Sequence, residues 1–214
     1  MHEFTEWPKT KRLFRDIVVT EKIDGTNSAI HITAVPHDEP GEIRVWDGHW
    51  TSPVVDGTRY VVTAQSRRRI ITPGKTTDNY GFAGWVYDNA ADLVRILGEG
   101  LHFGEWWGSG IQRGYEVPGR SFSLFNTERY VDIHEHVGEF NGVPVTVGPV
   151  PVLYSGTFSE TAICHELEAL KHFGSKAAPG FMNPEGICVF HSQTRNVYKV
   201  TLDNNDAGKW EAAA

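Results

Sequence analysis

The sequence is poor in the features that mark several large classes of protein. It has only two cysteines, Cys164 and Cys188, among 214 residues, which is too few for a disulfide framework and favours a reduced, cytoplasmic setting. No apolar run approaches the ~18 residues that a membrane span requires, and the first residues lack the apolar core of a signal peptide. We therefore expect an intracellular protein that acts without a membrane.

An excess of basic residues is also missing. The formal net charge is −7, which argues against a protein that coats nucleic acid with its whole surface. Basic residues nevertheless cluster in two stretches, PKTKRLFR (8–15) and QSRRRI (65–70). Such clusters are solvated faces in most proteins and phosphate-binding sites in some, and the sequence leaves both interpretations open.

Strand patterns dominate what is present. The stretch SAIHITAV alternates, with Ile30 and Ile32 on one face and His31 on the other. Asp56-Gly57 lies between β-rich arms and indicates a hairpin. Further strands are expected in DIVVTEKI, LHFGEWWG, RSFSLFN, RYVDIHEHV, VPVTVGPVPVLYSG, EGICVFH and NVYKVTL.

Two helices stand out between these strands. Asp88 can cap the first, which ends at Gly98, and Ser159 can cap the second, which ends at Gly174. Many strands with a few interspersed helices favour an α+β protein, with antiparallel sheets flanked by helices. No linker or repeat divides the chain, so we expect a single domain over residues 1–214.

The stretch EKIDGTNSAI places Lys22 at the end of an apolar strand, directly before the turn at Asp24-Gly25. A neutral lysine amine is a good nucleophile, and burial or neighbouring cations favour the neutral form. Glycine allows a sharp turn and leaves room for a ligand close to the backbone, while Asn27 adds a donor and an acceptor. From this stretch alone, an exposed lysine beside a hairpin is the simpler interpretation.

Six segments, taken in order, resemble the motifs of the covalent nucleotidyltransferases, which include RNA ligases, DNA ligases and mRNA capping enzymes. EKIDGTN resembles motif I, whose lysine forms a phosphoamide bond to a nucleoside monophosphate, and SRRR (66–69) resembles the arginine-bearing segment after it. FGEWWG (103–108), SFSLFN (121–126), PEGICVFH (184–191) and VYKVTL (197–202) resemble motifs III, IIIa, IV and V. The asparagine of motif I and the GEWWGSGIQ form of motif III are most similar to nick-sealing RNA ligases, which occur in phages and in RNA editing.

The resemblance implies a nucleotidyltransferase fold, similar to ATP-grasp, without a C-terminal OB domain. It implies an ATP-dependent RNA ligase with ATP and Mg²⁺ or Mn²⁺ as cofactors: lysyl-AMP forms, AMP passes to a 5′-phosphate, and a 3′-hydroxyl seals the strand. We expect a monomer that acts on RNA ends or nicked duplex, as in RNA repair, and a phage origin stays open. The alternatives are a DNA ligase, a GTP-using capping guanylyltransferase, or an end-binding module with impaired catalysis.

The resemblance also gives roles to single residues. Lys22 is the expected nucleophile, and Lys199 is a second catalytic lysine that contacts the α-phosphate. Glu185 is the expected metal ligand, because carboxylate oxygens suit Mg²⁺. Arg67 is expected to bind the phosphate or sugar of the nucleic-acid end. The expected nucleotide-binding residues are Glu21, Asp24, Asn27, Glu105, Phe125, Lys171 and Lys199.

Within the nucleotide-binding set, Glu105 is expected to accept hydrogen bonds from the ribose and Phe125 to stack on adenine. Two interpretations of Glu21 stay open: a position near adenine, as the resemblance implies, or an exposed carboxylate at the end of a strand. Motif V usually reads K-x-K in this superfamily, but here it reads Lys199-Val200-Thr201. Because Thr201 carries no charge, either another cation reaches the triphosphate or one step is weakened.

Two other patterns have simpler explanations. In VDIHEHV, alternation would place Asp132, His134 and His136 on one strand face, where they could bind zinc, although a wet polar face is the commoner arrangement. The stretch GSGIQRG (108–114) differs from the dinucleotide fingerprint in its spacing and lacks a clear following helix. We expect an ordinary glycine-rich loop there.

Overall fold

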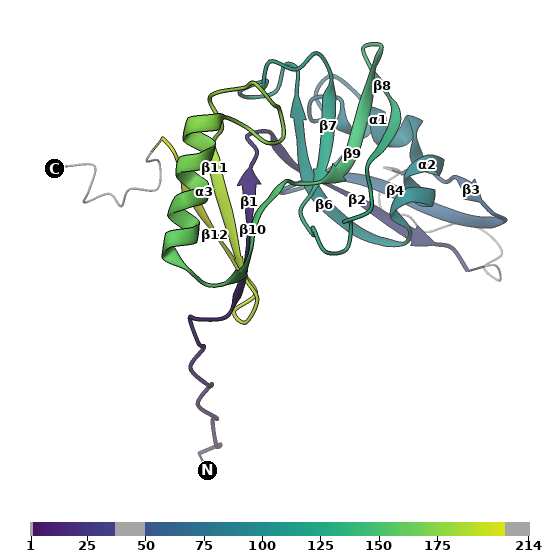
Figure 1. The fold of residues 1–214 in the computed structure, drawn as a ribbon. Helices are drawn as coiled ribbons and strands as arrows, with labels where there is room; N and C mark the ends of the chain where they lie inside the picture. Colours follow the sequence, from purple (N-terminus) through teal and green to yellow (C-terminus); the bar gives the residue numbers. More distant parts are fainter. Residues whose placement is uncertain (1, 37–49, 204–214) are drawn as a thin grey trace. The chain divides into compact units, whose positions relative to one another are not determined.

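The structure, a computed structural model, describes residues 2–36 and 50–203 of the chain. The chain divides into two compact units (Figure 1). Unit 1 comprises Met1–Lys22 and Pro151–Ala214, and unit 2 comprises Ile23–Val150. The expectation of a single domain stays a prediction. In the described part of the chain, no helix has the length and apolar character needed to cross a membrane.

Unit 1 is built on a four-stranded sheet in the order β10-β1-β11-β12. The strands are antiparallel to their neighbours and comprise β1 (Asp16–Lys22), β10 (Val152–Thr157), β11 (Gly186–His191) and β12 (Asn196–Thr201). The sequence predicts each of these strands from apolar, β-branched stretches.

One helix, α3 (Glu160–Phe173), covers a face of the unit 1 sheet (Figure 1). It begins and ends as the sequence predicts: the Ser159 hydroxyl accepts a hydrogen bond from Ala162 N, and Gly174 follows the last turn. The apolar stripe of the helix packs on alternate residues of the two central strands. The buried residues of this core are Ile17, Val19, Leu170, Ile187 and Val189.

Unit 2 contains the larger sheet, in the order β3-β4-β2-β6-β7-β9-β8, with β5 paired to β4. Only β7 and β9 run parallel among these described pairs. The strands are β2 (Thr26–Ala34), β3 (Val54–Val55), β4 (Thr58–Ser66), β5 (Ile70–Ile71), β6 (Gly100–Gly108), β7 (Arg120–Leu124), β8 (Glu135–Phe140) and β9 (Val143–Pro149). Antiparallel sheets and flanking helices confirm the expected α+β class.

The core of unit 2 lies between this sheet and two short helices, α1 (Phe82–Asp88) and α2 (Ala90–Leu97). Ile30 and Ile32 are fully buried and His31 is exposed, which confirms the predicted alternation of β2. Aromatic rings fill the centre, where Trp85 of α1 stacks on Trp106 of β6 with ring centroids 5.0 Å apart. Large apolar surface is buried here, which is the main favourable contribution to folding.

Two expectations about the helices and strands of unit 2 are wrong. The residue before α2 is Asn89, not Asp88, because Asp88 ends the unexpected helix α1. The strand expected from RYVDIHEHV begins only at Glu135. Before it the chain turns, and the Asn126 side chain accepts a hydrogen bond from Arg129 N, a local bond that competes with strand pairing.

The stretch VPVTVGPVPVLYSG forms two strands, not one. β9 ends at Pro149 and β10 begins at Val152. Prolines at both 149 and 151 explain the break, because proline has no N–H to donate to a strand partner. The boundary between the two units falls within this break.

Candidate active site

Lys22 is the last residue of β1 and lies on the face of the unit 1 sheet opposite α3, because its neighbours at alternate positions pack on the helix. The strand register aligns Lys22 with Gly186 of β11, and Gly186 in turn with Thr201 of β12. These three residues form one row across the sheet, which we call the Lys22 row. Two strand spacings, about 10 Å, separate its ends.

Gly186, at the centre of the Lys22 row, is a position that only glycine fits. Its φ is +151°, and a Cβ added there would lie 2.2 Å from the Val200 carbonyl oxygen. The absence of a side chain therefore lets β11 approach the backbone of β12 closely at the centre of the Lys22 row.

Glu185 directly precedes this glycine and pairs with the expected nucleophile. Lys22 Nζ lies 2.5 Å from Glu185 Oε2, and the side chains are 25% and 17% exposed. This oxygen is buried and accepts no hydrogen bond from the described residues, so the contact is an ion pair without hydrogen-bond geometry. The sequence predicts that cations lie around Lys22 and favour its neutral form. In the structure, the charged group paired with Lys22 is instead the Glu185 carboxylate.

Lys199 lies on the neighbouring row of the same face, where it is aligned with Cys188 of β11. Thr201, by contrast, lies on the Lys22 row itself. The second lysine that motif V usually supplies would therefore lie on the Lys22 row, at the position of Thr201. This chain has an uncharged, buried side chain there.

Glu21, next to the nucleophile, is buried and is fixed by a loop of unit 1. Its Oε1 accepts a hydrogen bond from Ser175 Oγ at 2.6 Å, and its Oε2 accepts from the backbone N of Lys176 at 2.7 Å and Ala177 at 2.9 Å. Burial raises the pKa of the Glu21 carboxyl, and these hydrogen bonds offset part of that effect. An exposed strand-end carboxylate, the alternative drawn from the sequence, is wrong.

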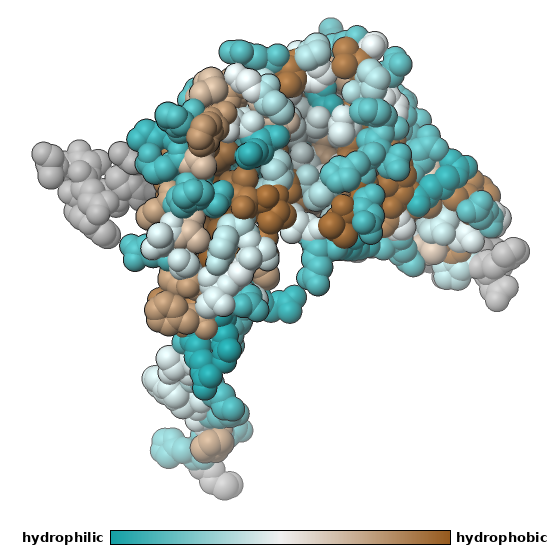
Figure 2. All heavy atoms as spheres, viewed as in Figure 1, coloured by the Kyte–Doolittle hydropathy of each residue, from teal (hydrophilic) through white to brown (hydrophobic). Residues whose placement is uncertain are grey.

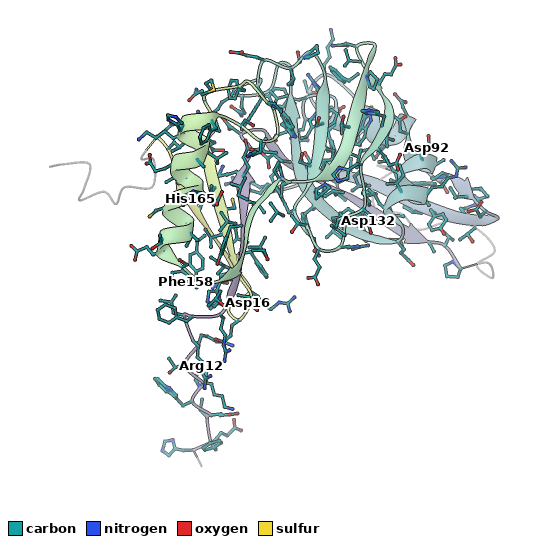
Figure 3. The ribbon with its side chains drawn as sticks, in the orientation of Figure 1. Arg12, Asp16, Asp92, Asp132, Phe158 and His165 are labelled. Atoms are coloured by element: carbon teal, nitrogen blue, oxygen red, sulfur yellow. The ribbon has the colours of Figure 1, made fainter. Side chains whose placement is uncertain are left out.

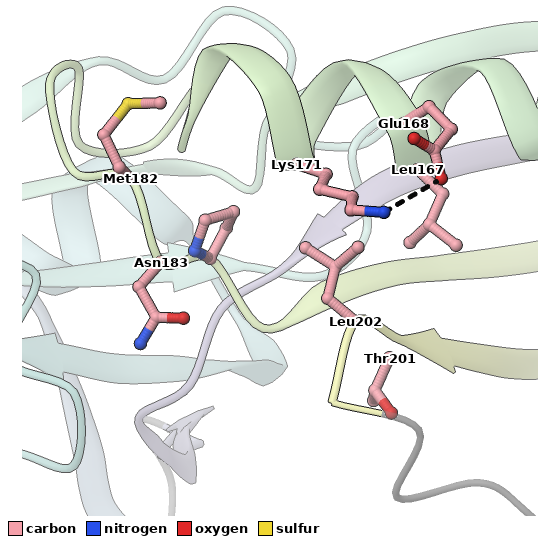
Figure 4. A pocket seen from close by; sticks show the side chains of 8 residues that line it. Leu167, Glu168, Lys171, Met182, Asn183, Thr201 and Leu202 are labelled. Atoms are coloured by element: carbon pink, nitrogen blue, oxygen red, sulfur yellow. Dashed lines mark ion pairs between the residues drawn. The ribbon is translucent and has the colours of Figure 1, made fainter.

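Lys171 lies in the last turn of α3 and lines a pocket of about 320 Å³ (Figure 4). Thr201 and Asn183 line the same pocket. Lys171 Nζ is directed toward Glu168, 3.7 Å from its Oε1, and both side chains are largely exposed. A surface pair of this kind contributes little to stability, so Lys171 can exchange Glu168 for another anion.

In unit 2, the strand register aligns Asn27 of β2 with Glu105 of β6, and Glu105 with Ser123 of β7. By alternation this row lies on the sheet face opposite α1 and α2, since the intervening residues pack in the core. Gly25 N donates a hydrogen bond of 3.1 Å to Glu105 Oε1. A Cβ at Gly25 would lie 2.5 Å from Trp106 O, so glycine is needed for this close approach.

Asp24 is held by two residues that the sequence does not single out. Arg113 Nε lies 3.1 Å from Asp24 Oδ2, and the Tyr115 hydroxyl accepts a hydrogen bond from Asp24 N at 2.8 Å. Arg113 belongs to the glycine-rich stretch after β6, which forms turns as expected, and Tyr115 directly follows that stretch. Tyr115 is buried at a positive φ of 53°, a conformation that marks a constrained loop.

Phe125 and Arg67 are exposed in unit 2. Phe125 directly follows β7 and is 41% exposed, and its backbone N donates to Phe103 O at 3.0 Å. Arg67 lies in the tight turn that joins β4 to β5. A flat aromatic face and a free guanidinium group are thus available to ligands at these positions.

A zinc site at Asp132, His134 and His136 finds no support. Only His136 belongs to a strand, so these residues do not share one strand face. Across residues 2–36 and 50–203, no three His, Cys, Asp or Glu side chains gather as a metal site would require.

The sequence model of the RNA ligase family matches residues 15–201. The chain belongs to the RNA ligase family. A comparison with curated proteins finds no match.

Solved structures of Naegleria gruberi RNA ligase share the fold. A mutant without nucleotide is 15% identical with a TM-score of 0.50, and the match covers 88% of this chain and 50% of that one. A mutant with AMP and Mn is 16% identical with a TM-score of 0.51, and the match covers 89% and 51%. This chain thus spans about half the length of the ligases it matches.

Proposed function

We propose that this protein is an ATP-dependent RNA ligase with a nucleotidyltransferase fold, which stores AMP covalently on Lys22. The observation that carries the proposal is the pairing of Lys22 with Glu185 on the unit 1 sheet, in a chain of the RNA ligase family. A solved Naegleria gruberi RNA ligase with AMP and Mn supports the choice of an adenine nucleotide and a divalent metal.

In the first step, the neutral Lys22 amine attacks the α-phosphorus of ATP. A P–N bond forms, the P–O bond to pyrophosphate breaks, and the amine loses a proton. Lys199, on the same face, stabilises the charge that gathers on the α-phosphate. Lys171 supplies a further cation for the phosphates, which compensates for the missing charge at Thr201.

The residues fit a hard divalent cation. Glu185 offers a buried carboxylate oxygen that accepts no hydrogen bond from the described residues, and Mg²⁺ is commonly held by one or two carboxylates together with substrate phosphates and water. A cation bound by Glu185 would compete with Lys22 for this carboxylate and would favour the neutral amine. Glu185 therefore serves both as metal ligand and as the resting partner of the nucleophile.

The nucleoside is recognised by residues of unit 2. Glu105 accepts hydrogen bonds from the ribose hydroxyls, with Asn27 beside it in the strand register. Phe125 stacks on adenine. Asp24 is fixed by Arg113 and holds the turn after Lys22 in place. Glu21 anchors the loop at Ser175.

In the later steps, AMP passes from Lys22 to a 5′-phosphate, so that the P–N bond breaks and a P–O bond forms. A 3′-hydroxyl then attacks the adenylylated end and AMP leaves. Arg67 binds the phosphate or sugar of that end. Phosphoryl transfer needs mainly positioning and charge stabilisation, which lysines, carboxylates and a metal supply.

The test is incubation with ATP labelled at the α-phosphate and Mg²⁺, followed by a denaturing gel. We expect a covalent label on the wild type and none on Lys22→Ala. The matched control is Lys22→Arg, which keeps the charge beside Glu185 but lacks the nucleophilic amine, and it should also take no label. Label on either variant would refute the role of Lys22.

The alternatives give different outcomes in the same assay. Label from GTP instead of ATP would indicate a capping guanylyltransferase, and sealing of DNA nicks in preference to matched RNA nicks would indicate a DNA ligase. Binding to nicked ends without any label would indicate an end-binding module with impaired catalysis.

A further inference from the structure

Residues 2–15 form an arm that precedes β1 and that unit 1 leaves uncovered. Every residue from His2 to Asp16 is exposed, and Phe4 and Trp7 are 91% and 87% exposed. Figure 1 shows the arm extending away from the end of β1. Exposed aromatic side chains in such a segment add little to the stability of the described fold, and their flat faces are accessible to another molecule.

The last part of the arm is attached to unit 1. Arg12 N donates a hydrogen bond of 2.6 Å to Gln193 Oε1 in the turn between β11 and β12. Phe158 N donates to Arg15 O at 2.8 Å, and the rings of Phe14 and Phe158 meet edge to face with centroids 6.0 Å apart. Figure 3 labels Arg12 on the arm and Phe158 at this junction. The arm therefore leaves the sheet from a fixed point.

Charge favours a polyanion as the partner of this arm. Between Trp7 and Arg15 the chain carries four cations and no acidic residue, although Glu3 and Glu6 precede this stretch in the arm and the formal net charge of the chain is −7. Figure 2 shows hydrophilic residues where the arm leaves the sheet. The adjoining β11–β12 turn adds Arg195, which is also exposed. The cations of the arm are Lys9, Lys11, Arg12 and Arg15.

We infer that the arm binds single-stranded RNA that runs from the ligation site, an inference that rests on the proposed function. Lysine and arginine side chains neutralise successive phosphates, and Trp7 and Phe4 offer flat faces on which bases stack. This combination of cations and exposed aromatic rings is what sequence-independent binding of single strands uses.

The length of β1 sets the distance between the base of the arm and Lys22. Asp16, at the base of the arm, and Lys22 are six residues apart on one strand, which corresponds to about 20 Å. A stacked strand advances about 3.4 Å per nucleotide, so about six nucleotides separate the nucleophile from the arm. RNA shorter than this should not gain from the arm.

The experiment measures the affinity for 5′-phosphorylated RNA of about 4 and about 16 nucleotides by fluorescence anisotropy at two salt concentrations. For the longer RNA, the triple variant Lys9→Ala/Lys11→Ala/Arg12→Ala should bind at least about tenfold more weakly, and the salt slope should fall by about 2. Trp7→Ala should lose about fivefold to 150-fold, and Trp7→Phe should recover most of this. The shorter RNA should bind all variants alike.

The control is Arg59→Ala/Lys75→Ala/Arg95→Ala, which removes the same charge from exposed positions of unit 2. An equal loss in this control would show that bulk charge is sufficient and would overturn the inference, as would unchanged binding of the longer RNA by the arm variants. The arm variants should still take up label from ATP. RNA binding through the arm without any label would refute only the proposed ligase, whereas label with an arm that has no effect on RNA would refute only this inference.

Discussion

Both units of the chain use their sheets in the same way, although the chemistry they carry differs. In unit 1 the face opposite α3 carries Lys22 and Lys199, and in unit 2 the face opposite α1 and α2 carries Asn27 and Glu105. One face of each sheet is packed against helices, and the other holds the proposed functional residues. Under the proposed function, phosphate chemistry belongs to unit 1 and nucleoside recognition to unit 2.

The two units differ in the size and composition of the hydrophobic core beneath these faces. The unit 2 core contains a cluster of buried aromatic rings that includes Phe82, Trp85, Trp106 and Phe122. The unit 1 core is small and aliphatic, and the buried Glu21 network adds polar contacts to it. We expect substitutions on the unit 1 face to change reaction rates most, and those on the unit 2 face to change nucleotide affinity.

The largest expected effect comes from Glu185. Glu185→Gln removes the charge that pairs with Lys22 and the hard ligand for a divalent cation, so the rate of self-labelling should fall by about 10²- to 10³-fold. Glu160→Gln, at an exposed position in the first turn of α3, is the matched control and should label normally. Equal rates in the two variants, measured by rapid quench, would show that Glu185 has no role in the chemistry.

Unit 2 should respond to acid through His102. This side chain is fully buried, its Nδ1 lies 2.8 Å from the Tyr130 hydroxyl and its Nε2 3.0 Å from Gly98 O. Burial lowers the pKa of His102 to about 4 from 6.5. Its contribution to the free energy of unfolding is therefore intact above pH 6.5 and is lost as the pH falls toward 4, by up to about 3 kcal/mol.

Hydrogen exchange resolved by peptide, at pH 7 and near pH 4.5, measures this dependence in unit 2. His102→Gln should flatten it, whereas His134→Gln, at an exposed position before β8, should leave it unchanged. The same acid sensitivity in the His102 variant would show that another group is responsible.

Phe125 tests the division of roles. Phe125→Ala should raise the Kd for ATP by about fivefold to 150-fold through loss of stacking, with little change in the rate of the bound complex. Phe173→Ala, at an exposed aromatic position of unit 1, should leave the Kd unchanged. A loss of rate at saturating ATP would place Phe125 in the chemistry and would weaken the comparison between the units.

The smallest expected effect concerns Thr201, the position where motif V usually has its second lysine. Thr201→Lys adds a cation to the Lys22 row and should raise the rate of self-labelling by up to about tenfold. Thr201→Met has a similar length without the charge and should give no gain. If both variants behave alike, the cation at this position is unnecessary and Lys171 is sufficient.

Local patterns predict most of the fold. Alternation predicts β2, and Ser159 and Gly174 mark the ends of α3 because capping depends on neighbouring residues alone. The short helix α1 escapes prediction, since its stretch FAGWVYD contains glycine and aromatic residues of low helical propensity. Packing of Trp85 in the core stabilises it instead, and this cannot be seen locally.

The contacts within the site are less predictable from the sequence than the helices and strands are. The motifs single out Lys22 and Glu185, but not that they pair directly, because a contact across 163 residues depends on strand register. Arg113 and Tyr115, which hold Asp24, lie in a stretch whose only signal is its glycine content. Side-chain contacts of this kind follow from the fold and not from spacing.

The most direct measurement of the central claim is to locate the adduct. After incubation with ATP and Mg²⁺, the protein is digested and the mass of each lysine-containing peptide is measured. We predict a single AMP adduct, on the peptide that contains Lys22, which pyrophosphate should reverse. An adduct on Lys199 or Lys171, or no adduct on any peptide, would contradict the account.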